Sequence, residues 1–214
     1  MRNLTKLPIP AILAENHEEW LRLYLDDKSN STNKYRYRHI DIKDTLKKET
    51  GWKCIYCESK IGHNTPGDVE HKIPSSKKEE FHFTWENLSV ACNECNRRKN
   101  DYYEDKPRFL DPYIDDVESI VEHIGPILSW KSGNEQGEIT VKTLELDTSK
   151  RSQLIFRKIE KIAGLNNLIE RYSSAASDAK KRILKIEIKR MGNWDSEYSC
   201  MILSVLKIKG VKVT

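Results

Sequence analysis

The sequence predicts an α+β fold in which a small module with short strands lies between two helical regions. Two observations support this prediction. Apolar residues recur at helical spacing in residues 11–28 and again after Thr148. Between these regions, two Cys-x-x-Cys pairs enclose a short strand-like segment, residues 68–73, which is followed by Pro74. We divide the chain into an N-terminal helical segment (1–50), a central module (51–110) and a C-terminal region (111–214).

Composition limits the possible classes of protein. The chain has 214 residues, of which 37% are hydrophobic and 33% are charged, and its formal net charge is +4. This charge is too small to indicate nucleic-acid binding by itself. No segment approaches the roughly 18 apolar residues of a membrane span, and the first ten residues lack the apolar core of a signal peptide. We therefore expect a cytoplasmic protein that does not associate with membranes.

The N-terminal segment is predicted to contain two helices. The first covers residues 11–28, where two prolines precede the helix start. The second covers residues 40–50. Between them, residues 35–39 alternate aromatic and basic side chains, a pattern that suits stacking on bases and contact with phosphates. An ordinary solvated turn explains this run equally well, so both interpretations stay open.

The C-terminal region is predicted to combine a small hairpin with helices. Residues 118–130 suit an extended segment, and residues 133–137 suit a turn into a second strand at 139–143. From Thr148 onward, apolar stripes predict helices, with a break near Gly164. Such stripes serve either as core or as a surface for a partner protein, which makes this region a candidate docking surface.

The cysteines predict a structural zinc site. Four of the five cysteines form the two Cys-x-x-Cys pairs, and this spacing places two thiolates at neighbouring corners of a tetrahedron. Four thiolates close the coordination shell, so this zinc would stabilise the fold without taking part in chemistry. The fifth cysteine, Cys200, is expected to be a buried apolar residue. The zinc ligands are Cys54, Cys57, Cys92 and Cys95.

The segment between the cysteine pairs resembles the HNH nucleases, the ββα-metal family. Several spaced elements agree together over about residues 52–100. The matching elements are Cys54-x-x-Cys57, Val69-Glu70-His71-x-x-Pro74, Trp85-x-Asn87-Leu88 and Cys92-x-x-Cys95-Asn96-x-x-Lys99. The resemblance implies two short strands and one helix around a single divalent cation, and in-line hydrolysis of a phosphodiester that leaves a 5′ phosphate and a 3′ hydroxyl.

The resemblance also implies a role for each matching residue. His71 would be the general base, Glu70 and Asn96 would be cation ligands, and Asn87 would hold the loop and orient the base. Many relatives have aspartate at the position of Glu70 and histidine at that of Asn96. Because both residues found here are oxygen donors, we expect Mg²⁺ or Mn²⁺ in the catalytic site. In a regular strand the side chains of Glu70 and His71 would point apart, so we expect a twist or bulge there.

Other residues near the motif have weaker claims to a role. Single basic side chains are more often exposed to solvent than bound to substrate, and loop histidines seldom contact metal or substrate. The basic candidates for binding substrate phosphate are Lys77, Lys78, Arg97, Arg98 and Lys99, and the two histidines are His63 and His82.

The flanking segments are similar to the HNH proteins of Septu-type and retron-linked anti-phage defence systems. This resemblance rests on looser motifs, such as Phe109-Leu-Asp-Pro112-Tyr in the linker after the module. It implies a nucleic-acid substrate and an ABC-type ATPase as partner. Two alternatives remain: a zinc-ribbon module that binds nucleic acid or protein without cutting, and a nuclease subunit that is silent without its partner. The sequence does not distinguish DNA from RNA as the substrate.

Overall fold

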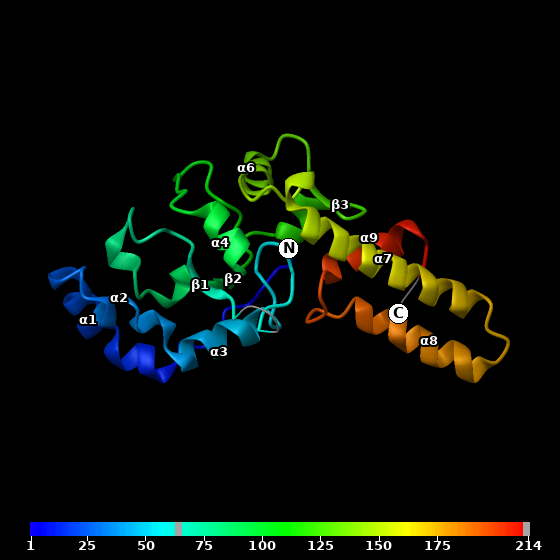
Figure 1. Ribbon diagram of the computed structural model, residues 1–214, viewed down its shortest axis with the longest axis horizontal. Coiled ribbons are helices and arrows are strands. Elements are labelled where there is room, and N and C mark those ends of the chain that lie inside the picture. Colours follow the sequence, from blue (N-terminus) through cyan, green and yellow to red (C-terminus); the bar gives the residue numbers. More distant parts are fainter. Residues whose placement is uncertain (63–65, 212–214) are drawn as a thin grey trace.

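The computed structural model describes residues 1–62 and 66–211. Figure 1 shows an elongated molecule with α1–α3 at one end, the central module in the middle and α7–α9 at the other end. The first half contains α1 (Ala11–Asp26), α2 (Ser31–Lys34), α3 (Ile40–Glu49), β1 (Asp68–His71), β2 (Leu88–Ala91) and α4 (Asn93–Lys99). The second half contains α5 (Val117–Ile120), β3 (Val121–Ile124), β4 (Ile127–Trp130), α6 (Glu135–Thr143), α7 (Ser152–Ser173), α8 (Asp178–Met191) and α9 (Ser199–Ile208).

The N-terminal segment forms both of the predicted helices. Helix α1 starts directly after Pro10 and buries Leu13, Trp20 and Tyr24, which recur at helical spacing along one face. Trp20 and Tyr24 pack edge-on against Phe83, in the long loop of the central module. The N-terminal helices therefore cover the module rather than forming a separate core.

The central module is a ββα unit, as predicted. Strands β1 and β2 pair antiparallel in four consecutive residue pairs, from Asp68 opposite Ala91 to His71 opposite Leu88. Helix α4 follows β2 directly, and Cys92 caps it by accepting a hydrogen bond from the backbone N–H of Cys95. The ladder is uninterrupted, so the bulge expected in β1 is absent. β1 also ends at His71, two residues earlier than predicted.

The small C-terminal hairpin exists, but its predicted position was wrong. It consists of β3 and β4, which turn at Gly125 within the segment 118–130 that was predicted to be extended. Helix α6 replaces most of the predicted turn at 133–137 and the whole predicted strand at 139–143. Asn134 caps that helix by accepting a hydrogen bond from the N–H of Gly137. A Cβ at Gly137 would lie 2.9 Å from the Cβ of Trp130, so this glycine allows the helix to approach β4 closely. Capping and packing thus override the strand propensity of the β-branched residues in α6.

The C-terminal helices are present where predicted, except that Gly164 does not interrupt α7. Helices α7 and α8 form an antiparallel pair that projects away from the module (Figure 1). One hydrophobic cluster contains Leu13, Leu88 and Met201, so all three sequence segments contribute to a continuous core. No helix within residues 1–62 or 66–211 is both long and apolar enough to cross a bilayer.

Candidate active site and metal centre

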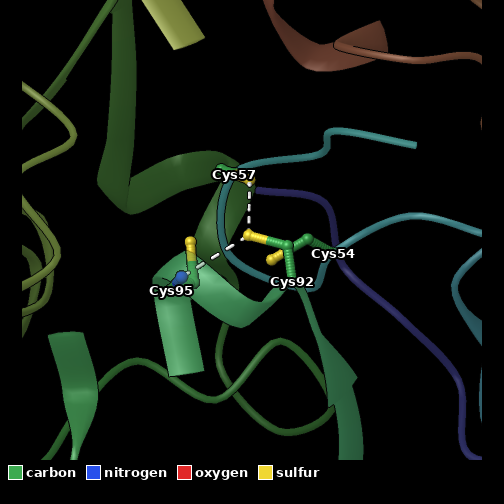
Figure 2. Close-up of side chains that lie close together, drawn as sticks. All are labelled: Cys54, Cys57, Cys92 and Cys95. Carbon is green, nitrogen blue, oxygen red and sulfur yellow. Dashed lines mark hydrogen bonds between the residues drawn. The ribbon is translucent and has the colours of Figure 1, made fainter. Parts of the chain in front are cut away.

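The four paired cysteines converge on one point, as predicted (Figure 2). Their sulfur atoms all lie within 4.8 Å of one another, and the sulfurs of Cys57 and Cys92 are 3.8 Å apart. Zinc–sulfur bonds of about 2.3 Å in a tetrahedron place neighbouring sulfurs about 3.8 Å apart. All four cysteines are free rather than disulfide-bonded. The arrangement therefore fits a closed tetrahedral site for a metal such as zinc.

Positive charge from the C-terminal region surrounds the cysteine cluster. Nη1 of Arg151 donates a hydrogen bond to the sulfur of Cys95 over 3.1 Å and another to the carbonyl oxygen of Leu144. Arg151 and Lys158 are both buried, and both come from the start of α7 and the turn before it. Four thiolates around a divalent metal carry a net negative charge, so these two cations offset it.

A buried polar network joins the first cysteine pair to α9. The Glu58 carboxylate accepts hydrogen bonds from Lys53 Nζ (3.2 Å), Ser199 Oγ (3.1 Å) and the backbone N–H of Cys200 (3.3 Å). Nearby positive charges hold the pKa of Glu58 at about 2, against the effect of burial. Cys200 itself is half-buried, and burial raises the pKa of its thiol to about 11. The C-terminal region therefore supports the metal module directly.

His71 is held in one orientation at the end of β1. Its ring stacks on that of His82, with centroids 4.8 Å apart, and meets the edge of the Tyr37 ring at 4.6 Å. Its Nε2 lies 2.9 Å from the carbonyl oxygen of His82. Since a carbonyl only accepts hydrogen bonds, Nε2 carries the proton and Nδ1 carries a lone pair. Burial lowers the pKa of His71 to about 3, so the ring is neutral near pH 7.

Asn87 fixes the loop that supplies this carbonyl. Its Oδ1 accepts a hydrogen bond from the N–H of Ile73 (2.7 Å), and its Nδ2 donates to the carbonyl oxygens of Ile73 and Phe81 (3.0 and 3.1 Å). The side chain thus ties both ends of the loop together next to His82. The His82 ring is held separately by Ser75, whose hydroxyl lies 2.6 Å from its Nδ1. The hydrogen bonds of Asn87 fix the shape of the loop between Ile73 and Asn87.

Glu70 and His71 point to opposite faces of β1. The Glu70 side chain is buried, and its carboxylate accepts hydrogen bonds from Lys99 Nζ at 2.7 Å and the Tyr56 hydroxyl at 3.3 Å. Burial raises the pKa of Glu70, and the adjacent ammonium opposes part of that rise. The regular strand therefore separates the predicted ligand from the predicted base, and no twist brings the two side chains together.

Asn96 shares a surface hollow with an acidic residue that the motif did not single out. The hollow has a volume of about 380 Å³ and lies over α4 and the start of β1. Its lining includes Asn96 and Asp68 but neither Glu70 nor His71. Asp68 stands two residues before Glu70, and residues at this spacing in a strand lie on the same face. This spacing is the sequence signal that could have identified Asp68 as a candidate ligand. Within the described residues, the four cysteines are the only cluster of three or more Cys, His, Asp or Glu side chains close enough to hold a metal.

All five basic residues that were predicted to bind substrate phosphate form ion pairs with carboxylates. Lys99 is only 2% exposed and also donates to the carbonyl oxygen of His71, so its ammonium does not reach the surface. The other four lie at or near the surface, each beside a carboxylate. Their partners are Asp101 for Lys77, Asp105 for Lys78, Glu94 for Arg97, and Glu94 and Glu145 for Arg98. His63 lies outside the described residues.

Residues 54–102 match the HNH endonuclease family model, and this range contains the four cysteines, the β1–β2 hairpin and helix α4. The chain is also similar to Septu protein PtuB from Bacillus mycoides (strain KBAB4), with 26% identity over 190 residues. This match covers 70% of the present chain and 64% of the relative, so the chain spans less than two thirds of that protein's length.

Proposed function

We propose that this protein is a metal-dependent endonuclease that hydrolyses phosphodiester bonds in nucleic acid. The observation that carries the proposal is the fixed, neutral ring of His71 inside an HNH domain. With Nε2 occupied by the His82 carbonyl, Nδ1 has no protein hydrogen-bond partner among the described residues. It can therefore accept a proton from an attacking water molecule. A phosphate anion beside the ring raises its pKa and makes it a stronger base.

The cation in this proposal is held by Glu70 and Asn96. Carboxylate and amide oxygens are ligands that suit Mg²⁺ or Mn²⁺, and the two residues come from neighbouring elements, β1 and α4. When bound, such a cation neutralises charge on the phosphate and on the leaving oxygen. Glu70 must exchange the ammonium of Lys99 for the cation, because the carboxylate is paired in the structure. We further propose products with a 5′ phosphate and a 3′ hydroxyl.

The test is cleavage of DNA and RNA pools by the purified protein with Mg²⁺ or Mn²⁺. Wild type should cleave at least one pool, and His71→Ala should lose about 100-fold or more of the rate, the usual contribution of a general base. His17→Ala, on α1, is the matched control and should retain full activity. Equal rates for wild type and His71→Ala would rule out His71 as the base.

We also propose that the protein serves anti-phage defence together with an ABC-type ATPase. The similarity to Septu protein PtuB supports the defence role. The docking surface in this proposal is the α7–α8 pair, where several large apolar side chains are 48–59% exposed and are therefore available to a partner. These side chains are Phe156, Ile159, Ile183 and Ile186.

Partner dependence is testable by co-expressing this chain with a candidate ABC-type ATPase. Co-purification should be lost in Phe156→Asp and Ile183→Asp and retained in Ile114→Asp, an exposed residue outside α7 and α8. If the ATPase is required, cleavage should appear only when it is added. Full cleavage by the isolated chain would show that the subunit is not silent alone.

A second candidate function is a zinc-bound module that binds nucleic acid or protein without cutting. The observation that favours it is the ion pair of Glu70 with Lys99, because this pair occupies the carboxylate that was predicted to bind the catalytic cation. This candidate needs the cysteines but neither His71 nor Asn96. Phage protection that survives the double change His71→Ala and Asn96→Ala would support it, and loss of protection would count against it.

A further inference from the structure

A basic and aromatic turn from outside the HNH domain borders His71. Residues Arg36–Arg38 form a 3-10 turn between α2 and α3, well before the domain begins at residue 54. Tyr37, at the centre of this turn, is buried, and its ring meets His71 edge-on at 4.6 Å and His82 at 5.1 Å. The N-terminal segment is thus fixed against the face of the module that carries the proposed base.

The neighbouring Arg38 is positioned beside this face. Its guanidinium carbon lies 4.4 Å from the centre of the Tyr35 ring and 5.7 Å from that of Tyr37. The Tyr37 ring in turn contacts His71, with ring centroids 4.6 Å apart, so the guanidinium lies on the same face of the module as the proposed base. Two aromatic rings therefore hold an exposed guanidinium next to the proposed base.

Arg38 also differs from the five basic residues of the module that were predicted to bind phosphate, because it has no carboxylate partner among the described residues. Among the residues that the structure describes, no Asp or Glu oxygen lies within 4.0 Å of its guanidinium nitrogens, whereas Lys77, Lys78, Arg97 and Arg98 all have such neighbours. No carboxylate of the described residues therefore competes with an added anion for this guanidinium. A guanidinium matches two phosphate oxygens at once, and stacking on rings lowers the entropy lost on binding.

We propose that Arg38 binds a backbone phosphate of the nucleic-acid substrate beside His71, so that the 36–38 turn forms one wall of the active site. This inference rests on the proposed nuclease function and extends it to a residue outside the HNH domain. A solvated turn does not require Tyr37 to be buried against the two stacked histidines, nor an unpaired arginine next to them. The turn therefore has the features of a substrate-binding element.

The experiment compares Arg38→Gln and Arg38→Lys with Arg182→Gln, an exposed control on α8. Steady-state cleavage of a DNA or RNA oligonucleotide gives kcat and KM. Affinity for the same oligonucleotide is measured by fluorescence anisotropy in the His71→Ala background, between about 50 and 200 mM salt. Arg38→Gln should lower affinity at least several-fold and reduce the slope of log affinity against log salt by about 1. Arg38→Lys should restore the salt slope, because it keeps the charge, but only part of kcat/KM.

The outcomes separate this inference from the proposed function. Wild-type kcat/KM, affinity and salt slope in Arg38→Gln would overturn the role of Arg38 while leaving the nuclease assignment intact. If wild type cleaves nothing, the proposed function fails, but the anisotropy measurement still tests the phosphate contact of Arg38. An affinity loss specific to Arg38→Gln supports that contact. Equal affinities, or no binding by either protein, overturn it. Circular dichroism and zinc content of each variant check that the fold is unchanged.

Discussion

Glu70 and Lys99 form an ion pair in the interior of the central module, with 2.7 Å between carboxylate oxygen and ammonium nitrogen. Both side chains are 2% exposed. Lys99 also donates to the carbonyl oxygen of His71. Its ammonium therefore links helix α4 to two consecutive residues of β1, Glu70 and His71. The pair therefore links the stability of the module to the position of its candidate catalytic strand.

Breaking this pair should destabilise the protein strongly. Lys99→Met leaves a buried carboxylate without its partner, which costs about 3–5 kcal/mol of unfolding free energy. The double variant Glu70→Gln with Lys99→Met should recover much of that loss, since no charge remains buried. Urea unfolding in excess zinc measures both. Lys77→Met, which removes an exposed pair, should change stability by less than about 1 kcal/mol. Simple additivity in the double variant would contradict the coupling.

Asn87 should be needed for activity and for part of the stability. Asn87→Ala removes three hydrogen bonds that hold the loop beside His82, and it leaves buried backbone groups unpaired, at a cost of about 1–3 kcal/mol. The His82 carbonyl would then no longer orient His71, so cleavage should fall while zinc content stays normal. Asn167→Ala, an exposed change on α7, provides the comparison. A variant with normal cleavage would show that the loop holds its shape without this side chain.

The cysteine cluster should bind one zinc ion per chain. Cys92→Ser removes one of four thiolates and should abolish tight zinc binding, because the other three leave the tetrahedron open. Cys200→Ser should retain full zinc content, since this cysteine lies outside the cluster. Elemental analysis and thermal unfolding provide the measurements. Full zinc occupancy in Cys92→Ser would place the metal elsewhere.

Arg151 should strengthen zinc binding from outside the ligand set. Its guanidinium donates to the sulfur of Cys95, and such supporting contacts are typically worth 10- to 100-fold in metal affinity. Arg151→Gln should therefore release zinc to a chelator at about 10- to 100-fold lower competitor concentration. Arg157→Gln, exposed on the same helix, should match wild type. Equal zinc affinity in the Arg151 and Arg157 variants would refute this role.

His123 should make the fold sensitive to acid. Both of its ring nitrogens are buried without a hydrogen-bond partner among the described residues, and burial lowers its pKa well below the usual value. As pH falls below about 6.5, His123 takes up a proton in the unfolded chain but stays neutral in the folded chain, so the free energy of unfolding decreases. His123→Phe should lessen this decline and raise stability at pH 8. His17→Phe is the control, and Tm from pH 8 to 5 in excess zinc is the measurement. Parallel pH profiles for wild type and His123→Phe would disprove the effect.

Local patterns in the sequence predicted much of the fold. The Cys-x-x-Cys spacing and the helical periodicity of α1 and α7 depend on residues close together along the chain, and each is present in the structure. The β1–β2–α4 order, which the resemblance to HNH nucleases implied, is present as well. The misplaced hairpin shows where such patterns fail. The β-branched residues of α6 favour a strand, but the Asn134 cap and the close packing of Gly137 against β4 favour a helix. Packing energy outweighs propensity at that position.

The sequence by itself determined which donor groups are present: four thiolates for one metal, and a histidine with oxygen ligands in an HNH pattern. Only the tertiary structure decided which of them meet. It separated Glu70 from His71 on opposite faces of a regular strand and paired Glu70 with Lys99. It also brought Tyr37 to His71 from outside the matched domain, with Arg38 beside the Tyr37 ring. The reason is physical: contacts between distant segments follow from packing and from the cost of burying charge, and neither is encoded in local spacing.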